Sequence, residues 1–236
     1  MGCTESRSKL IEEEAIVFAE DGLRFSKSDA ETVNATMRSH SLGGKVNPLQ
    51  LARISEELGV QFTNTHPHTK VQTLLKKFRQ FDQEYCLEDL LVLGILLSQG
   101  TAFTKASLLF QVFSTPEQTI ALSSLKTEVL HKLSSISRSL SCLVTNQQGK
   151  GAMEMKVSRF SENLAQVQAG CISQVAQHMG LNGAQVTQDT FVRVLRTFRS
   201  GALVNASGWR LFMHEAFLKL PQLKEEASTP TSTTSK

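Results

Sequence analysis

Residues 87–113, LEDLLVLGILLSQGTAFTKASLLFQVF, decide the fold of this 236-residue chain. They hold two apolar runs at helical spacing on either side of Gly100, which predicts two buried helices that meet at a tight turn. The first run is about half of the roughly twenty residues that a bilayer-spanning helix needs, and Glu88 and Asp89 stand at its start. We therefore interpret the stretch as the core of a helical protein and not as a membrane anchor.

The composition around this stretch is that of an ordinary globular protein, with 40% hydrophobic and 20% charged residues. The formal net charge is only +3, and the Lys and Arg residues are scattered along the chain. No nucleic-acid role is indicated, because phosphate binding concentrates positive charge on one face. The cysteines have no metal-binding spacing, which indicates a reducing compartment. They are Cys3, Cys86, Cys142 and Cys171.

The N-terminus carries an acylation pattern, Met1-Gly2-Cys3-Thr4-Glu5-Ser6. Removal of Met1 would expose Gly2 for myristoylation, with Ser6 at the favoured hydroxyl position, and Cys3 is placed for palmitoylation. Two acyl chains give stable anchoring where one gives only marginal membrane residence. We expect attachment to the cytosolic face of a membrane; the alternative is a chance match to the pattern.

The rest of the chain predicts an all-α fold, because no sustained alternation of apolar and polar residues marks a strand. In the first helix, Ile11, Ile16 and Phe18 are expected on the apolar side, and the acidic run 12–14 on a solvated face. A C-terminal amphipathic helix carries Trp209 and ends at Pro221. The expected helices are 9–23, 28–37, 49–58, 68–81, 87–97, 105–113, 122–140, 157–179, 187–198 and 206–220.

These helices group into four helix-loop-helix units, which suggests two pairs. The predicted organisation has an acylated arm with a short helix at 1–28, a first pair at 29–100 and a second pair at 101–205. The C-terminal amphipathic helix follows at 206–221 and a Ser/Thr-rich tail at 222–236. In this organisation residues 87–113 form the joint between the two pairs.

Two of the loops carry the clearest family pattern, around Gly43-Gly44-Lys45-Val46 and around Gly183-Ala184-Gln185-Val186. Each places a loop glycine and a β-branched residue just before the next helix. These units resemble EF-hands. The Leu-rich helix with Gly100, together with the helix that starts near Lys105, resembles the middle segment of recoverin-like and calcineurin-B-like proteins. The resemblance covers about residues 29–200 and implies two EF-hand-like pairs; an acylated Gly2 belongs to the recoverin-like pattern.

A second resemblance is to the EF-hand-like N-terminal region of acylated TLDc-domain proteins. It rests on the N-terminal Gly, the Leu-rich helix with Gly100 and Lys105, and the aromatic helix around Trp209. The β-rich TLDc domain that follows in those proteins is missing from this sequence. The chain would then be the helical part of such a protein without that domain.

The loop chemistry departs from the calcium-binding EF-hand, which takes carboxylate oxygens from loop positions 1, 3, 5 and 12. In the first unit these positions are Ser39, Ser41, Gly43 and Gln50, and in the fourth they are Met179, Leu181, Gly183 and Thr190. The second unit keeps Asp82 and Asp89 in a loop too short to surround the ion, and the third has only Glu117. We therefore expect no calcium binding, no other metal site and no cofactor.

Motifs for nucleophilic, zinc or nucleotide chemistry are missing, and His66-Pro67-His68 is interpreted as a turn before a helix. We expect a non-catalytic, membrane-tethered interaction module that presents a hydrophobic groove to a partner helix, with the C-terminal helix able to fill that groove itself. The alternative is a structural subunit of a larger assembly whose N-terminus is packed rather than lipidated. The expected partner-binding residues are Trp209, Phe212, Phe217, Leu93, Phe110 and Phe113.

Overall fold

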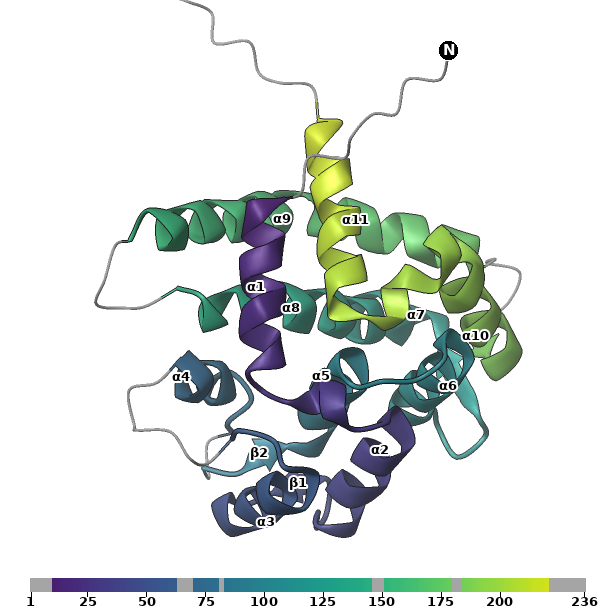
Figure 1. Cartoon of the computed structure of the whole chain (residues 1–236). Coiled ribbons are helices and arrows are strands. Elements are labelled where there is room, and N and C mark those ends of the chain that lie inside the picture. The colour runs from purple at the N-terminus through teal and green to yellow at the C-terminus, as the bar shows by residue number, and fades with distance from the viewer. Residues whose placement is uncertain (1–9, 63–69, 81–82, 146–150, 180–183, 221–236) are drawn as a thin grey trace, which may run out of the picture.

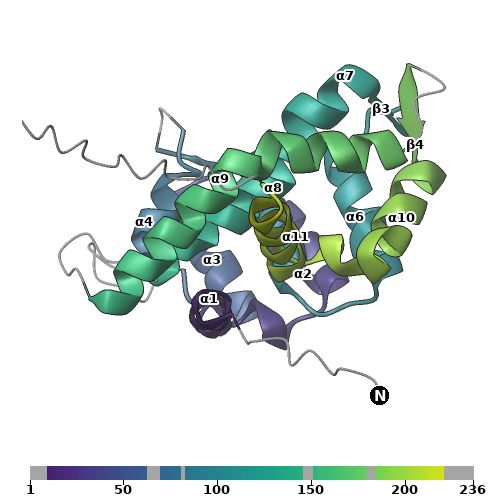
Figure 2. The ribbon, with the colours of Figure 1, turned by 90° about the horizontal axis from the view of Figure 1, so that it is seen from above.

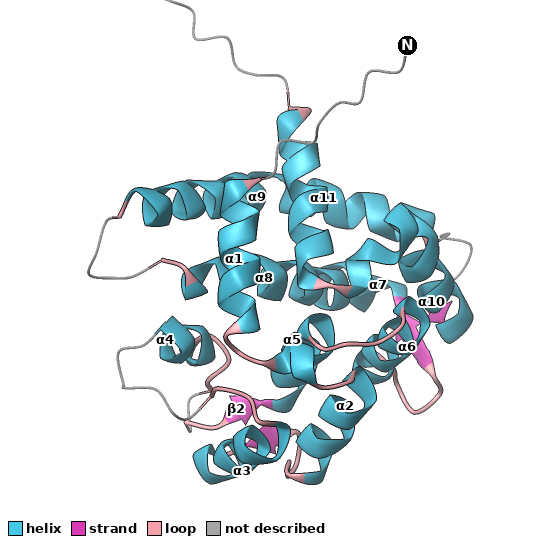
Figure 3. Ribbon diagram, in the orientation of Figure 1, coloured by secondary structure: helices cyan, strands magenta, loops and turns pink. Residues whose placement is uncertain are grey.

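The computed structural model describes residues 10–62, 70–80, 83–145, 151–179 and 184–220, and within them the fold is all-α with short paired strands (Figures 1 and 3). The α-helices are α1 (Ile11–Asp21), α2 (Ala30–Ser39), α3 (Pro48–Leu58), α4 (Lys70–Lys76), α5 (Leu87–Leu97), α6 (Ala102–Phe113), α7 (Leu122–Ser124), α8 (His131–Ser139), α9 (Ala152–His178), α10 (Gln188–Thr197) and α11 (Ala206–Leu218). The strands are β1 (Lys45–Val46), β2 (Tyr85–Cys86), β3 (Thr119–Ala121) and β4 (Gln185–Thr187). The prediction of an all-α fold is confirmed.

The strands lie in the loops between helices, and each strand pairs with a strand of one other loop. In the first half, β1 pairs antiparallel with β2, with Val46 opposite Tyr85. In the second half, β3 pairs antiparallel with β4, with Ile120 opposite Val186. All four of these side chains are buried, so each short strand contributes an apolar residue to the core. The strands escaped the sequence analysis because two or three residues are too few to show an alternating pattern.

Capping residues fix several helix starts where the sequence places them. Asp29 accepts a hydrogen bond from the Thr32 amide at the start of α2, with an Oδ1 to N distance of 2.7 Å. Asn47 and Gln50 form a reciprocal capping box at the start of α3. Such side chains satisfy the amide groups that have no partner in the first turn of a helix. The predicted start of the helix near residue 29 is thereby confirmed.

Three helices differ from the sequence expectation, and one of them, α9, starts at Ala152 instead of near Val157. The helix expected over 68–81 is described only as α4, and residues 63–69 and 81–82 lie outside the described part of the chain. The helix expected over 122–140 is interrupted by a π-helical turn, Leu125–Leu130, between α7 and α8. A 3₁₀ turn, Leu140–Leu143, then ends this segment. Wide turns of this kind depend on tertiary packing, which helical periodicity alone does not reveal.

The Leu-rich helix α5 is the central element of the first half. Its residues from Leu90 to Leu96 are all buried, and it packs against α2, α6 and α8. The turn to α6 depends on Gly100, whose φ of +149° is a conformation that L side chains rarely adopt. Residues 87–113 therefore form two buried helices that meet at a tight turn, as their apolar pattern predicts.

The terminal helices α1 and α11 lie side by side over the rest of the molecule (Figures 1 and 2). α11 packs across α8 and α9, and α1 packs against α9 and the 3₁₀ turn Leu140–Leu143. The buried apolar side chains of both halves and both terminal helices belong to one continuous cluster. The two ends of the chain are thus brought together on one side of the fold.

Candidate functional site

The joint between the terminal helices is a buried ion cluster centred on Arg210. Its guanidinium donates from Nε and Nη2 to the two carboxylate oxygens of Glu13, at 2.8 Å each, and from Nη1 to Oε1 of Glu20 at 2.6 Å. Nη1 also donates to the carbonyl oxygen of Ser137 on α8 at 2.9 Å. Arg210 is completely buried, so α11, α1 and α8 are connected by charge-assisted hydrogen bonds inside the protein.

The charges of this cluster stabilise one another in a site where the carboxylates keep only slight contact with solvent. Burial alone disfavours the charged guanidinium, but the neighbouring carboxylates of Glu20 and Glu13 outweigh it and raise the pKa of Arg210 above its usual range. Burial also raises the pKa of the Glu20 carboxyl, an effect that the charge of Arg210 opposes. The expectation that residues 12–14 form a solvated face is wrong for Glu13, because Arg210 holds that side chain in the interior.

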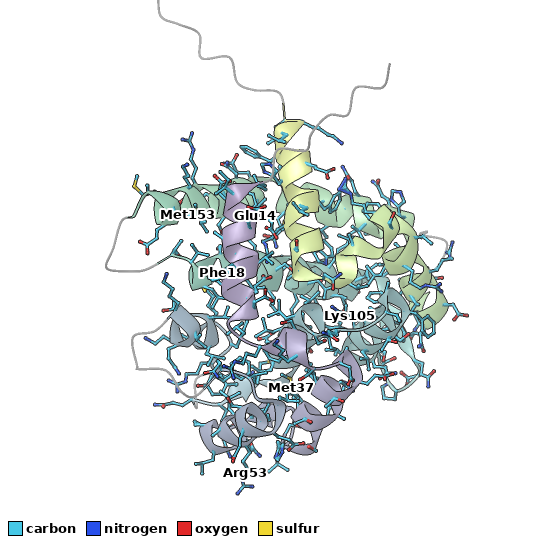
Figure 4. The ribbon with its side chains drawn as sticks, viewed as in Figure 1. Glu14, Phe18, Met37, Arg53, Lys105 and Met153 are labelled. Carbon is cyan, nitrogen blue, oxygen red and sulfur yellow. The ribbon has the colours of Figure 1, made fainter. Side chains whose placement is uncertain are left out.

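The opposite side of α1 exposes apolar side chains. Phe18 is 82% exposed and Ile11 is 53% exposed, whereas Ile16 is the apolar residue of α1 that is fully buried. A spacing of seven residues places Ile11 and Phe18 on the same side of the helix. The expectation that both face the apolar interior with Ile16 is therefore wrong, and Figure 4 labels Phe18 on α1.

The neighbouring helix α11 repeats this arrangement. Leu211 is 40% exposed and Leu218 is 64% exposed, again seven residues apart. Between the two helices a groove of about 230 Å³ is lined by Val17 on α1 and by Ala206 and Ser207 on α11, among others. We call the exposed side chains of Ile11, Phe18, Leu211 and Leu218 the terminal patch.

The residues expected to bind a partner lie mostly inside the protein. Trp209, Phe212, Leu93 and Phe110 are buried, and Phe113 and Phe217 are partly buried against the same core. Trp209 and Phe212 lie on the side of α11 that packs against α8 and α9, so α11 itself covers them. A partner would reach these rings only if α11 left its place, and their role in binding stays a prediction.

Lys105, singled out in the sequence as part of the family pattern, has an internal position (Figure 4). Its Nζ donates to the carbonyl oxygens of Leu96 and Ser98, at 3.0 Å each, and to Oδ1 of Asn205 at 2.5 Å. Burial lowers the pKa of Lys105 to about 8. Because it satisfies carbonyl groups at the end of α5 and a side chain at the start of α11, we assign it a structural role.

Several predicted site residues lie outside the described part of the chain. Gly2 and Cys3 are among them, as are the His66 and His68 pair and the loop residue Asp82. Within the described residues, no group of three or more His, Cys, Asp or Glu side chains is arranged to hold a metal ion. No helix in the described ranges is long and apolar enough to cross a membrane.

No family model, no curated protein and no solved structure matches the chain.

Sequence reasoning missed both the ion cluster and the terminal patch. Arg210 is 190 residues from Glu20 along the chain, and no local pattern couples positions so far apart. A signal was present in its position, because Arg210 lies between Trp209 and Phe212 in an otherwise apolar helix face. An arginine in such a place needs a buried acid, and α1 carries the acids.

Proposed function

We propose that this chain is a non-catalytic, membrane-tethered protein-interaction module built from EF-hand-like units that do not use calcium. The observation that supports it is the terminal patch, a set of exposed apolar side chains on the two helices that lie side by side at the ends of the chain. Solitary exposed apolar residues are common, whereas several on adjacent helices suit an interaction surface. The proposed partner is an amphipathic helix of a membrane-associated protein.

Two features support the EF-hand-like part of the proposal. The connections pair in chain order, β1 with β2 and β3 with β4, which is how consecutive EF-hand loops would associate. The positions that would carry calcium-binding carboxylates are Ser39, Ser41, Gly43 and Gln50 in the first unit. A scaffold of this kind would hold its shape without the ion, so its interactions would not follow calcium concentration.

The acylation pattern explains why the terminal patch would face a membrane-associated partner. Ile11 lies nine positions beyond Gly2, and nine steps of fully extended chain span at most about 32 Å. An acyl chain on Gly2 would therefore keep α1 close to the bilayer. The patch would then meet partners that lie at the membrane surface at high effective concentration.

The experiment tests membrane attachment and partner binding separately. The full chain is expressed in cells supplied with a myristate analogue. Its label, its membrane fraction and its cross-linked partners are then compared for three proteins: the parent, Gly2→Ala, and a double variant with Phe18→Ser and Leu211→Ser. Leu49→Ser is the control, because Leu49 is 77% exposed on α3 and does not belong to the terminal patch.

We expect Gly2→Ala to lose the label and the membrane fraction, and the double variant to keep both but lose its partner. The control should behave like the parent. A double variant that captures the same partner as the parent would refute the surface, and a Gly2→Ala chain that keeps its label would refute the tether. A permanent structural subunit, the alternative, would be recovered only in an assembly and without the label.

A further inference from the structure

A second cleft, remote from the terminal patch, lies between the two halves of the molecule. It has a volume of about 560 Å³ and is bounded by the end of α4, the start of α5, the π-helical turn and α8. This volume is in the range of small-molecule sites, about 300–1,000 Å³. π-Helical turns occur frequently at functional sites, and Thr127 and Glu128 of this turn line the cleft.

One end of the cleft is acidic. Glu88 and Asp89, in the first turn of α5, both form ion pairs with Lys132 of α8, and the distance from Lys132 Nζ to Asp89 Oδ1 is 2.7 Å. Glu128 adds a third carboxylate to the lining. Three carboxylates against one ammonium leave this end with an excess of negative charge. His131 also lines the cleft, beside Lys132 in the sequence.

The other end is basic. Arg138 lies ten residues beyond Glu128, which corresponds to about 15 Å along a helix axis. Lys77 also lines the cleft, directly after α4, which packs against the 3₁₀ turn Leu140–Leu143 that follows Arg138. Burial raises the pKa of the Cys142 thiol, and the positive charge of Lys77 opposes that effect. Within the described ranges, neither Lys77 nor Arg138 forms an ion pair with a carboxylate.

Arg138 has a feature that packing alone does not explain. Its Nε atom is buried and, among the described residues, has no hydrogen-bond acceptor. A buried donor without an acceptor is costly and rare in a folded protein. An anion at this end of the cleft would supply acceptor oxygens for the guanidinium group. Between the two charged ends, Phe78 and Ile136 provide an apolar wall.

We propose that this cleft binds a small dipolar molecule, with a carboxylate or phosphate group at Arg138 and Lys77 and an ammonium group at the carboxylates around Glu128. The separation of the two charged ends suits a flexible molecule with an apolar linker. A simple anion would leave the excess negative charge of the acidic end without a partner, and a simple cation would leave Arg138 unpaired. This binding site is independent of the proposed membrane-tethered function.

The test is a calorimetric titration of the full chain with four probes. 6-Aminohexanoate and 6-aminohexyl phosphate are dipolar molecules with an apolar linker, whereas inorganic phosphate and butylammonium carry a single type of charge. The variants are Arg138→Gln and Glu128→Gln, and Arg53→Gln is the control because Arg53 is exposed on α3 and does not line the cleft. Circular dichroism on each variant reports whether the fold is retained.

We expect a dipolar probe to bind and each cleft variant to weaken it about tenfold or more, because each removes one charged contact. Arg138→Lys should recover part of the loss, since it restores the charge without the fork of donors. Whether the carboxylate or the phosphate probe binds more tightly identifies the anion. Failure of both dipolar probes to bind overturns the proposal. So does equal binding to the parent and Arg138→Gln, or binding of inorganic phosphate as tight as that of 6-aminohexyl phosphate.

Discussion

Replacement of Arg210 by methionine tests the buried ion cluster directly. The substitution removes four hydrogen bonds, three to the carboxylates of Glu13 and Glu20 and one to the Ser137 carbonyl oxygen. The residues Glu13 and Glu20 are 5% and 9% exposed, so water can replace the lost partner only in part. Removing one partner of a buried ion pair destabilises a protein by about 3–5 kcal/mol. We expect the free energy of unfolding at pH 7 to fall by about this amount.

The loss should depend on pH in a defined direction. In the Arg210→Met variant burial raises the pKa of the Glu20 carboxyl without an opposing positive charge. A carboxyl whose pKa is higher in the folded state than in the unfolded state binds more protons when folded, so stability rises as pH falls. The difference in unfolding free energy between parent and variant should therefore shrink between pH 7 and pH 5.

The chain contains a reporter for this measurement. Trp209 is the single tryptophan, is completely buried, and precedes Arg210. Its fluorescence in urea, compared with far-UV circular dichroism, gives the unfolding free energy and tests for two-state behaviour. Arg53→Met is the control, because Arg53 is exposed on α3 and its removal should change stability by less than about 0.5 kcal/mol.

A compensated variant decides whether the charges or the shape of the site matter. Glu13→Leu and Glu20→Leu added to Arg210→Met remove every charge of the cluster, and such replacements are often neutral or stabilising. We expect this triple variant to recover most of the loss. A loss below about 1 kcal/mol for Arg210→Met, or a triple variant as unstable as the single one, would refute the reasoning.

Three further predictions concern packing, protonation and calcium. Gly94→Ala should destabilise the protein by about 1–3 kcal/mol, because a Cβ there would lie 2.6 Å from Cγ1 of Val33. The Cβ of Gly170→Ala on α9 would meet nothing within 4 Å, so this variant should stabilise the protein by up to about 1 kcal/mol. Urea unfolding compares the two variants with the parent. Burial lowers the pKa of Lys105 to about 8, so above that pH the unfolded chain binds more protons than the folded chain. The free energy of unfolding should therefore rise between about pH 8 and pH 10 in the parent relative to Lys105→Met. Calorimetry with calcium should give no binding heat at micromolar concentrations, and a micromolar affinity would contradict the account of the carboxylate-poor loops.

The sequence predicts the helical elements well where local chemistry determines them. Asp29 caps α2, Gly100 forms the turn after α5, and the density of leucine in residues 87–97 indicates a buried helix. These signals act within a few residues, so periodicity and capping are sufficient. The π-helical turn at Leu125–Leu130 and the shortened α4 could not be predicted, because packing between distant segments determines them.

The candidate sites were less accessible from the sequence. The cleft combines Lys77 just after α4, Glu88 on α5 and Arg138 on α8, which come together only after the two halves pack. The terminal patch was missed for another reason. Periodicity identifies an apolar side of α1 but does not say which side faces the core, and in this helix the buried carboxylates determine the answer.

The orientation of α1 links the ion cluster to the terminal patch. Ile16 and Phe18 point in directions about 200° apart around the helix, so α1 cannot bury both against one surface. Rotation that buried Phe18 would gain about 2–3 kcal/mol of apolar burial but would pull Glu13 and Glu20 away from Arg210, at a cost of about 3–5 kcal/mol. The ion cluster therefore favours the observed orientation, in which Phe18 is exposed. It follows that Arg210, although completely buried, is the residue that keeps Phe18, the most exposed member of the terminal patch, on the surface.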